Sequence, residues 1–215
     1  MKQLKLGLYL ITGAYPNLGR GHLDIARAAL AGGADVIQIR EKEAGAKQLL
    51  GVALEARDLL DKNGSDCLFF INDDVDVALA CEADGVHVGR DDLSAGEARS
   101  LCGPAMFLGV SASNVLEAEE AEQEGADYIG VGPIFATPSK ADAAAPIGME
   151  GLRLIRESVG MPIVAIGGIN HDNAAGVLEA GADGVAVISA VATAADMEES
   201  VRRLRRLVDS FGKGR

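Results

Sequence analysis

Charged side chains stand at the ends of short apolar runs in the first half of the chain. The first run ends with Gln38, Arg40 and Lys42 at alternating positions. Asp73 and Asp92 follow the next two runs of this kind. Proteins usually bind Mg²⁺ through one or two carboxylates together with water and phosphate oxygens, and neighbouring cations attract the same phosphates. These residues therefore predict a magnesium site that receives a diphosphate.

A second anion site is predicted in the C-terminal half of the chain. Gly167 and Gly168 follow one apolar run, and Ser189 ends the next one. Backbone N–H groups exposed at glycines bind phosphate, and the loops after the last two strands of a parallel barrel are a common phosphate site. The pattern is typical of a site for a monophosphate.

A long segment without predicted secondary structure, 133–148, separates these two sites in the sequence. It carries Thr137, Ser139 and Lys140. Structureless loops of this length are uncommon in compact domains and are usually functional. We therefore expect a lid that closes over an anion, and a plain surface loop is the alternative. Two anion sites with a lid between them suit the joining of two phosphorylated molecules, one of which loses pyrophosphate.

Simpler roles are open to several of these residues. The cations after the first run could form a structural ion-pair layer with Glu41 or Asp73. Asp74 and Asp91 precede helical patterns and are expected to cap those helices. Ser111, at the end of another apolar run, could also be a cap. His87 lies between two valines, and we expect it to be a hydrogen-bonded core residue rather than a catalyst.

The elements that position these residues are marked by a short repeat. An aspartate that ends a helical pattern and precedes a β-branched run occurs at positions 35, 84, 127 and 183, so the intervals are 49, 43 and 56 residues. In three copies a glycine stands where a helix would end, because glycine reaches a positive φ without steric cost. One βα unit of a barrel takes about 25–30 residues. Each interval therefore holds two units.

Eight strands alternating with eight helices follow from this spacing. The strands are expected at 7–12, 35–40, 67–71, 84–88, 106–111, 127–131, 162–166 and 183–188. The helices are expected near 21–31, 46–63, 74–82, 95–101, 114–124, 149–158, 171–180 and 195–210. This alternation predicts an α/β fold, a single (β/α)₈ TIM barrel over residues 1–215. An open doubly wound sheet is the alternative.

Composition narrows the class of partner. The chain has 215 residues and a formal charge of −12, which disfavours nucleic acid and anionic membranes. No apolar run has the length of a membrane span. Three cysteines without a Cys-x-x-Cys pair are typical of a reducing, cytoplasmic location. The expected ligands are small phosphorylated molecules. The sequence does not determine the oligomeric state, and a homo-oligomer is compatible with it.

Taken in order, these motifs resemble the thiamine phosphate synthase family, and the resemblance covers nearly the whole chain. Each motif is weak alone, but the joint set is specific. The matching segments are Gln38-Ile39-Arg40-Glu41-Lys42, Ile71-Asn72-Asp73, 83–89, Asp92, Gly109-Val110-Ser111, 127–135, 164–169 and Val187-Ile188-Ser189.

The resemblance implies a transferase that couples 4-amino-5-hydroxymethyl-2-methylpyrimidine diphosphate to a thiazole monophosphate, by a dissociative substitution that releases pyrophosphate. It implies one Mg²⁺ per subunit, held by Asp73 and Asp92. The pyrimidine diphosphate would be bound by Gln38, Arg40, Lys42, Asn72, Ser111 and Lys140, of which Arg40, Ser111 and Lys140 would be catalytic. The thiazole phosphate would be bound by Thr137, Ser139, Gly168, Ile188 and Ser189.

This chain departs from the family pattern at three positions. Ser139 stands where the family usually has threonine, Arg90 where glutamine is common, and Gly13 where an acid is common. Two other functions are compatible with a similar sequence: a thiazole tautomerase-like paralogue, and a non-catalytic protein that binds thiamine phosphates and regulates a partner. Neither function needs the two aspartates and the cations beside them, so the presence of these residues favours the synthase.

Overall fold

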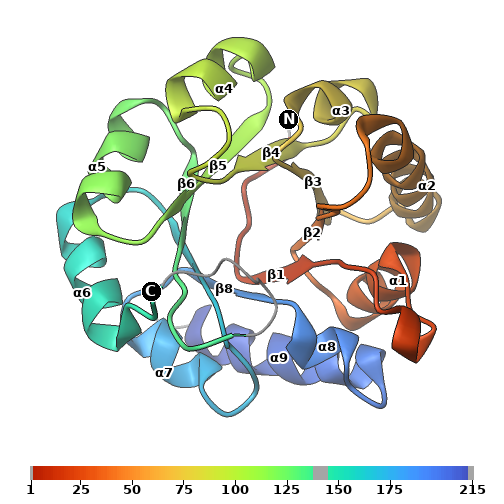
Figure 1. Cartoon of the computed structure of the whole chain (residues 1–215). Coiled ribbons are helices and arrows are strands. Elements are labelled where there is room, and N and C mark those ends of the chain that lie inside the picture. Colours follow the sequence, from red (N-terminus) through yellow and green to blue (C-terminus); the bar gives the residue numbers. More distant parts are fainter. Residues whose placement is uncertain (1, 138–144, 213–215) are drawn as a thin grey trace.

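Eight parallel strands close into a barrel whose outer surface is covered by helices (Figure 1). The computed structural model describes residues 2–137 and 145–212. Neighbouring strands pair in chain order and β8 pairs with β1, so the (β/α)₈ barrel is confirmed and the open sheet is wrong. The strands are β1 (Leu8–Ile11), β2 (Val36–Ile39), β3 (Leu68–Asn72), β4 (Gly85–Val88), β5 (Phe107–Ala112), β6 (Tyr128–Val131), β7 (Ile163–Ile166) and β8 (Gly184–Val187).

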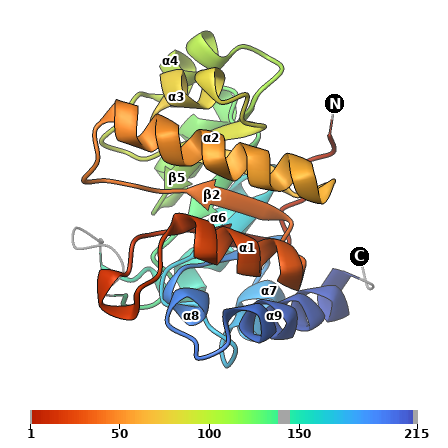
Figure 2. The ribbon, with the colours of Figure 1, turned by 90° about the vertical axis from the view of Figure 1, so that its right-hand side faces the viewer.

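The helices follow the predicted pattern with two additions. They are α1 (His22–Gly32), α2 (Ala46–Asn63), α3 (Val75–Ala80), α4 (Ala95–Cys102), α5 (Val115–Gln123), α6 (Gly148–Ser158), α7 (Ala174–Glu179), α8 (Ser189–Ala192) and α9 (Met197–Gly212). The sequence did not predict α8 or the 3₁₀ turn η1 (Pro16–Leu18). Figure 2 shows the described segment before β1 and the C-terminal end of α9 at the same end of the barrel.

The apolar core has two parts. Side chains on the outer faces of the strands, such as Ile37 and Ile39, pack against the surrounding helices. The barrel interior is filled by a smaller group that includes Tyr9, Phe70 and Tyr128, whose rings meet near its centre. Within the described residues, no helix is long and apolar enough to cross a membrane.

The four repeated aspartates hold one end of the barrel together. Each precedes an even-numbered strand, and its carboxylate accepts the backbone N–H of the strand before it. The distances are 2.8 Å for Asp35 to Leu8, 2.8 Å for Asp84 to Phe69, 2.7 Å for Asp127 to Leu108 and 2.9 Å for Asp183 to Ile163. An arginine from a surrounding helix also pairs with each one: Arg205, Arg57, Arg99 and Arg156, respectively. The repeat therefore fixes the register between neighbouring strands.

One copy of the repeat lacks the glycine. Glu82 stands there with a φ of 51°, in the left-handed region that Gly125 occupies in another copy with a φ of 91°. The Glu82 side chain is exposed. It therefore carries the conformational cost without a compensating buried contact.

Glu82→Gly is expected to raise the free energy of unfolding by about 0.5–1 kcal/mol, because relief of the left-handed strain exceeds the added entropy of the unfolded chain. Denaturant unfolding measures this difference. The matched control is Gly125→Ala, whose new Cβ would lie no closer than 3.8 Å to Arg99. The control is expected to lose about 1 kcal/mol. A loss of stability in Glu82→Gly would contradict the assignment of strain.

Candidate active site

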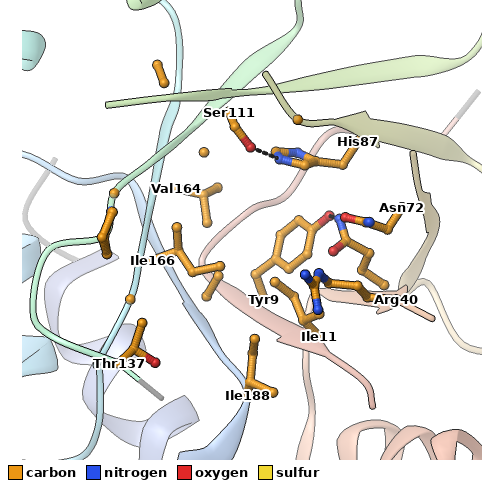
Figure 3. A pocket seen from close by; sticks show the side chains of 18 of the residues that line it. Tyr9, Ile11, Arg40, Asn72, His87, Ser111, Thr137, Val164, Ile166 and Ile188 are labelled. Carbon is orange, nitrogen blue, oxygen red and sulfur yellow. Dashed lines mark hydrogen bonds between the residues drawn. The ribbon is translucent and has the colours of Figure 1, made fainter. Parts of the chain in front are cut away.

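A cavity opens at the end of the barrel where the strands terminate, opposite the repeated aspartates. Figure 3 shows its lining side chains converging from several strands. Eleven of the residues predicted from the sequence line it: Gln38, Arg40, Lys42, Asn72, Asp73, Asp92, Ser111, Thr137, Gly168, Ile188 and Ser189. Ser139 and Lys140 lie outside the described residues. The structure thus brings the two predicted anion sites into one cavity, and the roles of the individual residues stay predictions.

The end of β2 directs three polar side chains into this cavity. Successive side chains of a strand point to opposite faces. Ile37 and Ile39 are fully buried on the helix-facing side, whereas Gln38, Arg40 and Lys42 line the cavity. Within the described part of the chain, Arg40 forms no ion pair with a carboxylate. Its guanidinium charge is therefore available to an anionic ligand.

Two carboxyl groups meet beside these cations. Asp73 shares a side-chain hydrogen bond with Asp92 and forms an ion pair with Lys42. Burial and the neighbouring Asp92 raise the pKa of Asp73 from 3.8 to about 6, although Lys42 opposes this shift. The sequence offered Glu41 or Asp73 as ion-pair partners for the cations, and Lys42 pairs with Asp73. The pair lies at the cavity rim, where the Lys42 side chain is 46% exposed, and not in a layer within the barrel.

Local backbone geometry holds the two carboxyl groups in place. Asp73 has a φ of 66°, and its N–H donates to the carbonyl of His87 at 2.7 Å. Left-handed backbone at an aspartate is uncommon, and such strain is found mainly at functional sites. The Asp92 carboxylate accepts the N–H of Gly89 at 2.9 Å, which closes a turn after β4. Both groups are therefore positioned by their own loops.

Of the two helix-capping predictions, one is confirmed and one is wrong. Asp74 caps α3, because its carboxylate accepts the N–H of Val77 at 2.9 Å. The prediction for Asp91 is wrong: Ser94 caps α4 and forms a capping box with Glu97. The turn after β4 separates Asp91 from that helix and leaves it on the cavity wall.

The opposite side of the cavity contains the predicted monophosphate site. Gly168 has a φ of 64°, and a Cβ there would lie 2.7 Å from the carbonyl oxygen of Ala136. The Gly168 carbonyl accepts the Asn173 side-chain amide at 3.0 Å. Ser189 begins α8, in which the N–H groups of Val191 and Ala192 already donate to the Ile188 carbonyl, so only the N–H groups of Ser189 and Ala190 have no acceptor inside the helix. Four residues are too few for helical periodicity to be visible in the sequence, which explains why α8 was missed.

The predicted lid is described only at its two ends. The N–H of Ile134 donates to the carbonyl of Ile166 at 2.8 Å, and the N–H of Phe135 donates to Gly167 at 3.0 Å. On the other side, the N–H of Ile147 donates to Pro133 at 2.9 Å. Both ends of the segment are thus attached to the barrel next to the glycine pair.

Sequence reasoning missed the position of His87. Hydrogen bonding was expected and is confirmed, but the residue also lines the cavity and contacts Ser111. The His87 Nε2 atom lies 3.0 Å from the Ser111 hydroxyl, and Nδ1 lies 3.0 Å from the hydroxyl of Tyr128. Strand alternation places His87 on the interior face, and that was the available signal. Arg90, one of the departures from the family pattern, pairs with Glu117 at 3.2 Å on the cavity wall.

Comparisons with known proteins agree on one family. Residues 8–191 match a family model described as thiamine monophosphate synthase. The chain is 56% identical over 201 residues to a thiamine-phosphate synthase of Chloroflexus aurantiacus, covering 94% of this chain and 92% of that protein. It is 55% identical to one from Moorella thermoacetica, covering 94% and 95%. A solved thiamine phosphate pyrophosphorylase of Pyrococcus furiosus matches with a TM-score of 0.85 and 44% identity over 96% of each chain.

Asp73→Asn is expected to change how stability depends on pH when no divalent ion is present. The folded state holds the Asp73 proton more tightly than the unfolded state does, since the folded pKa is raised to about 6. Wild type should therefore gain stability relative to the variant as the pH falls from about 7.5 to about 5. Denaturant unfolding in excess chelator at these pH values measures the difference.

The matched control is Asp91→Asn, which removes a charge of the same sign from the neighbouring loop. The stability difference from wild type is expected to change more with pH for Asp73→Asn than for this control. If the two variants show the same dependence on pH, the raised pKa of Asp73 is wrong.

Proposed function

Because the chain belongs to the thiamine monophosphate synthase family and has the activity of a thiamine-phosphate synthase, we propose that the two sides of its cavity divide the two substrates. This activity joins 4-amino-5-hydroxymethyl-2-methylpyrimidine diphosphate to a thiazole monophosphate and releases pyrophosphate. The diphosphate would lie beside β2 to β4, and the monophosphate would lie between Gly168 and Ser189.

The distribution of charge around the cavity supports this division. Arg40, Lys42 and the two carboxyl groups of Asp73 and Asp92 gather at one side. The opposite side presents a glycine turn and the start of α8 instead. A diphosphate carries more charge than a monophosphate and requires more cations. The cation-rich side therefore suits the diphosphate better.

The residues present fit a bound Mg²⁺. Asp73 and Asp92 are already in hydrogen-bond contact, and two carboxylates are a usual protein contribution when phosphate oxygens and water complete the shell. Asp73 and Asp92 would hold the ion. When bound, Mg²⁺ would neutralise charge on the departing diphosphate.

The chain's own side chains would then stabilise the substitution. The bond between the pyrimidine methylene carbon and the diphosphate oxygen breaks, and a thiazole ring nitrogen bonds to the carbon. Arg40 and Lys42 would attract the negative charge that grows on the leaving group. Lys140 is proposed for the same role, Gln38 and Asn72 would bind the pyrimidine, and Ser111 would bind the diphosphate. Thr137, Ser139, Gly168, Ile188 and Ser189 would bind the thiazole phosphate.

The reactive carbon also needs protection from water. A pyrimidine methylene cation would react with any water that reached it. One wall of the cavity is apolar and carries Ile11, Val164, Ile166 and Ile188 near the ring of Tyr9 (Figure 3). Such a wall would help to exclude water from the cation while the thiazole nitrogen approaches.

The two other functions require less than this cavity contains. A tautomerase-like paralogue or a regulatory binding protein would need the monophosphate side but neither Asp73 nor Asp92.

We also propose a cytoplasmic location, supported by three cysteines that are free and buried. This location fits a reducing compartment.

The test is formation of thiamine phosphate and pyrophosphate by the purified chain, with Mg²⁺ and with excess chelator. Turnover is expected only with Mg²⁺, and Asp92→Ala is expected to lower kcat by about a hundredfold or more, because the departing charge loses stabilisation. Asp76→Ala is the matched control, since Asp76 is exposed on α3 and outside the cavity. Full turnover in chelator, or in Asp92→Ala, would contradict the proposed metal site.

A further inference from the structure

Five polar side chains form one continuous hydrogen-bonded chain across the barrel interior. It starts at the Gln38 amide, which donates to the Tyr9 hydroxyl at 2.9 Å. The Tyr9 hydroxyl lies 2.9 Å from that of Tyr128, which lies 3.0 Å from Nδ1 of His87. The chain ends where Nε2 of His87 meets the Ser111 hydroxyl at 3.0 Å. It therefore links β2, β1, β6, β4 and β5.

The barrel is shaped around the rings in this chain. A Cβ on Gly109 would lie 2.2 Å from the Tyr128 ring, and a Cβ on Gly130 would lie 2.8 Å from the His87 ring. In the strand register, Gly109 stands opposite both His87 and Tyr128. Close packing on both sides holds the two rings in a single orientation. The chain is consequently a fixed part of the interior.

The direction of donation along this hydrogen-bonded chain is inferred from its buried end, at Gln38. Gln38, Tyr9 and Tyr128 are each no more than 2% exposed. Each phenol remains neutral, because burial raises the pKa of both hydroxyls, and therefore has a single proton to donate. Gln38 donates to Tyr9, and if each hydroxyl donates onward, the Tyr9 proton lies toward Tyr128 and the Tyr128 proton toward Nδ1 of His87. A neutral imidazole would then carry its proton on Nε2 and donate it to Ser111.

This direction decides what Ser111 presents to the cavity. When the Ser111 oxygen accepts from His87, its own O–H is free to point toward the ligand space that it lines. If the chain ran the other way, the Ser111 proton would be used on His87 and only lone pairs would face the ligand. Lone pairs repel a diphosphate, and a hydroxyl donor attracts it.

We propose that His87 is a positioning residue, which holds the Ser111 hydroxyl as a hydrogen-bond donor to the diphosphate through its Nε2–H form. The inference rests on the proposed role of Ser111 in diphosphate binding. It assigns a function to His87, Tyr128 and Tyr9 beyond filling the barrel interior.

The first test is the ¹⁵N NMR spectrum of the His87 ring in the ligand-free protein. Wild type is expected to show the proton on Nε2, with Nδ1 unprotonated. Tyr128→Phe removes the hydroxyl that donates to Nδ1 and should lower the Nε2–H population while preserving the packing of the ring. A proton found on Nδ1 in wild type would overturn the proposed direction of the chain.

The second test is a double-mutant cycle between Tyr128→Phe and Ser111→Ala. In the wild-type background, Tyr128→Phe is expected to lower kcat/KM for the pyrimidine diphosphate about fivefold, the usual effect of one hydrogen bond. The loss should fall mainly on kcat, because the charge on the leaving diphosphate grows in the transition state. In the Ser111→Ala background the same change should have almost no effect. His87 hydrogen-bonds both Tyr128 and Ser111, so coupling between these two residues is expected to pass through its ring.

Two variants at position 87 test the proposal independently if Tyr128→Phe or Ser111→Ala fails to fold. His87→Gln retains an N–H donor near Ser111 and should keep more activity than His87→Leu, with folding of both verified by thermal unfolding. Multiplicative losses in the cycle would overturn the positioning role. If Ser111→Ala is as active as wild type, the proposed role of Ser111 in diphosphate binding is wrong. The NMR result on the direction of the hydrogen bonds would be unaffected.

Discussion

The contact between two carboxyl groups, those of Asp73 and Asp92, sets the conditions for binding in this cavity. Two like charges in contact and partly buried repel each other, and burial together with the neighbouring Asp92 raises the pKa of Asp73. One lysine relieves it in part. A diphosphate adds further negative charge to a chain whose net charge is already −12. In the proposed function, a divalent ion held by the two acids would offset this charge. The cations at the end of β2 would then act on the leaving group.

That contact depends in turn on the register of the barrel. Asp73 follows β3 and Asp92 follows β4, and their loops meet only if the two strands are correctly aligned. At the far end, the Asp84 carboxylate binds the first part of β3 while its own backbone leads into β4. The same device recurs on alternate strands around the barrel. One end of the molecule thus fixes the alignment that the chemistry at the other end uses. This separation of stability from function is usual in parallel barrels.

Much of this arrangement could be predicted from the sequence, because it follows from short-range regularities. The alternation of Gln38 and Arg40 with Ile37 and Ile39 needs only the two-residue period of a strand. The repeated aspartates needed only their spacing. Features that depend on contacts between strands were not predictable in this way. The place of the His87 ring depends on room left by Gly130 on β6, and that of the Tyr128 ring on room left by Gly109 on β5. Asp91 resembled a helix cap, but the turn closed by Asp92 moves the helix start to Ser94. The helix α8 is too short to leave a periodic pattern.

The most direct test of the requirement for a divalent ion is the binding of inorganic pyrophosphate, measured by isothermal titration with Mg²⁺ and in excess chelator. For wild type, Mg²⁺ is expected to tighten pyrophosphate binding by about tenfold or more, because it screens the repulsion between like charges. In the double variant Asp73→Asn with Asp92→Asn, this dependence on Mg²⁺ should be lost. Equal tightening by Mg²⁺ in wild type and the double variant would contradict a site built around these two acids.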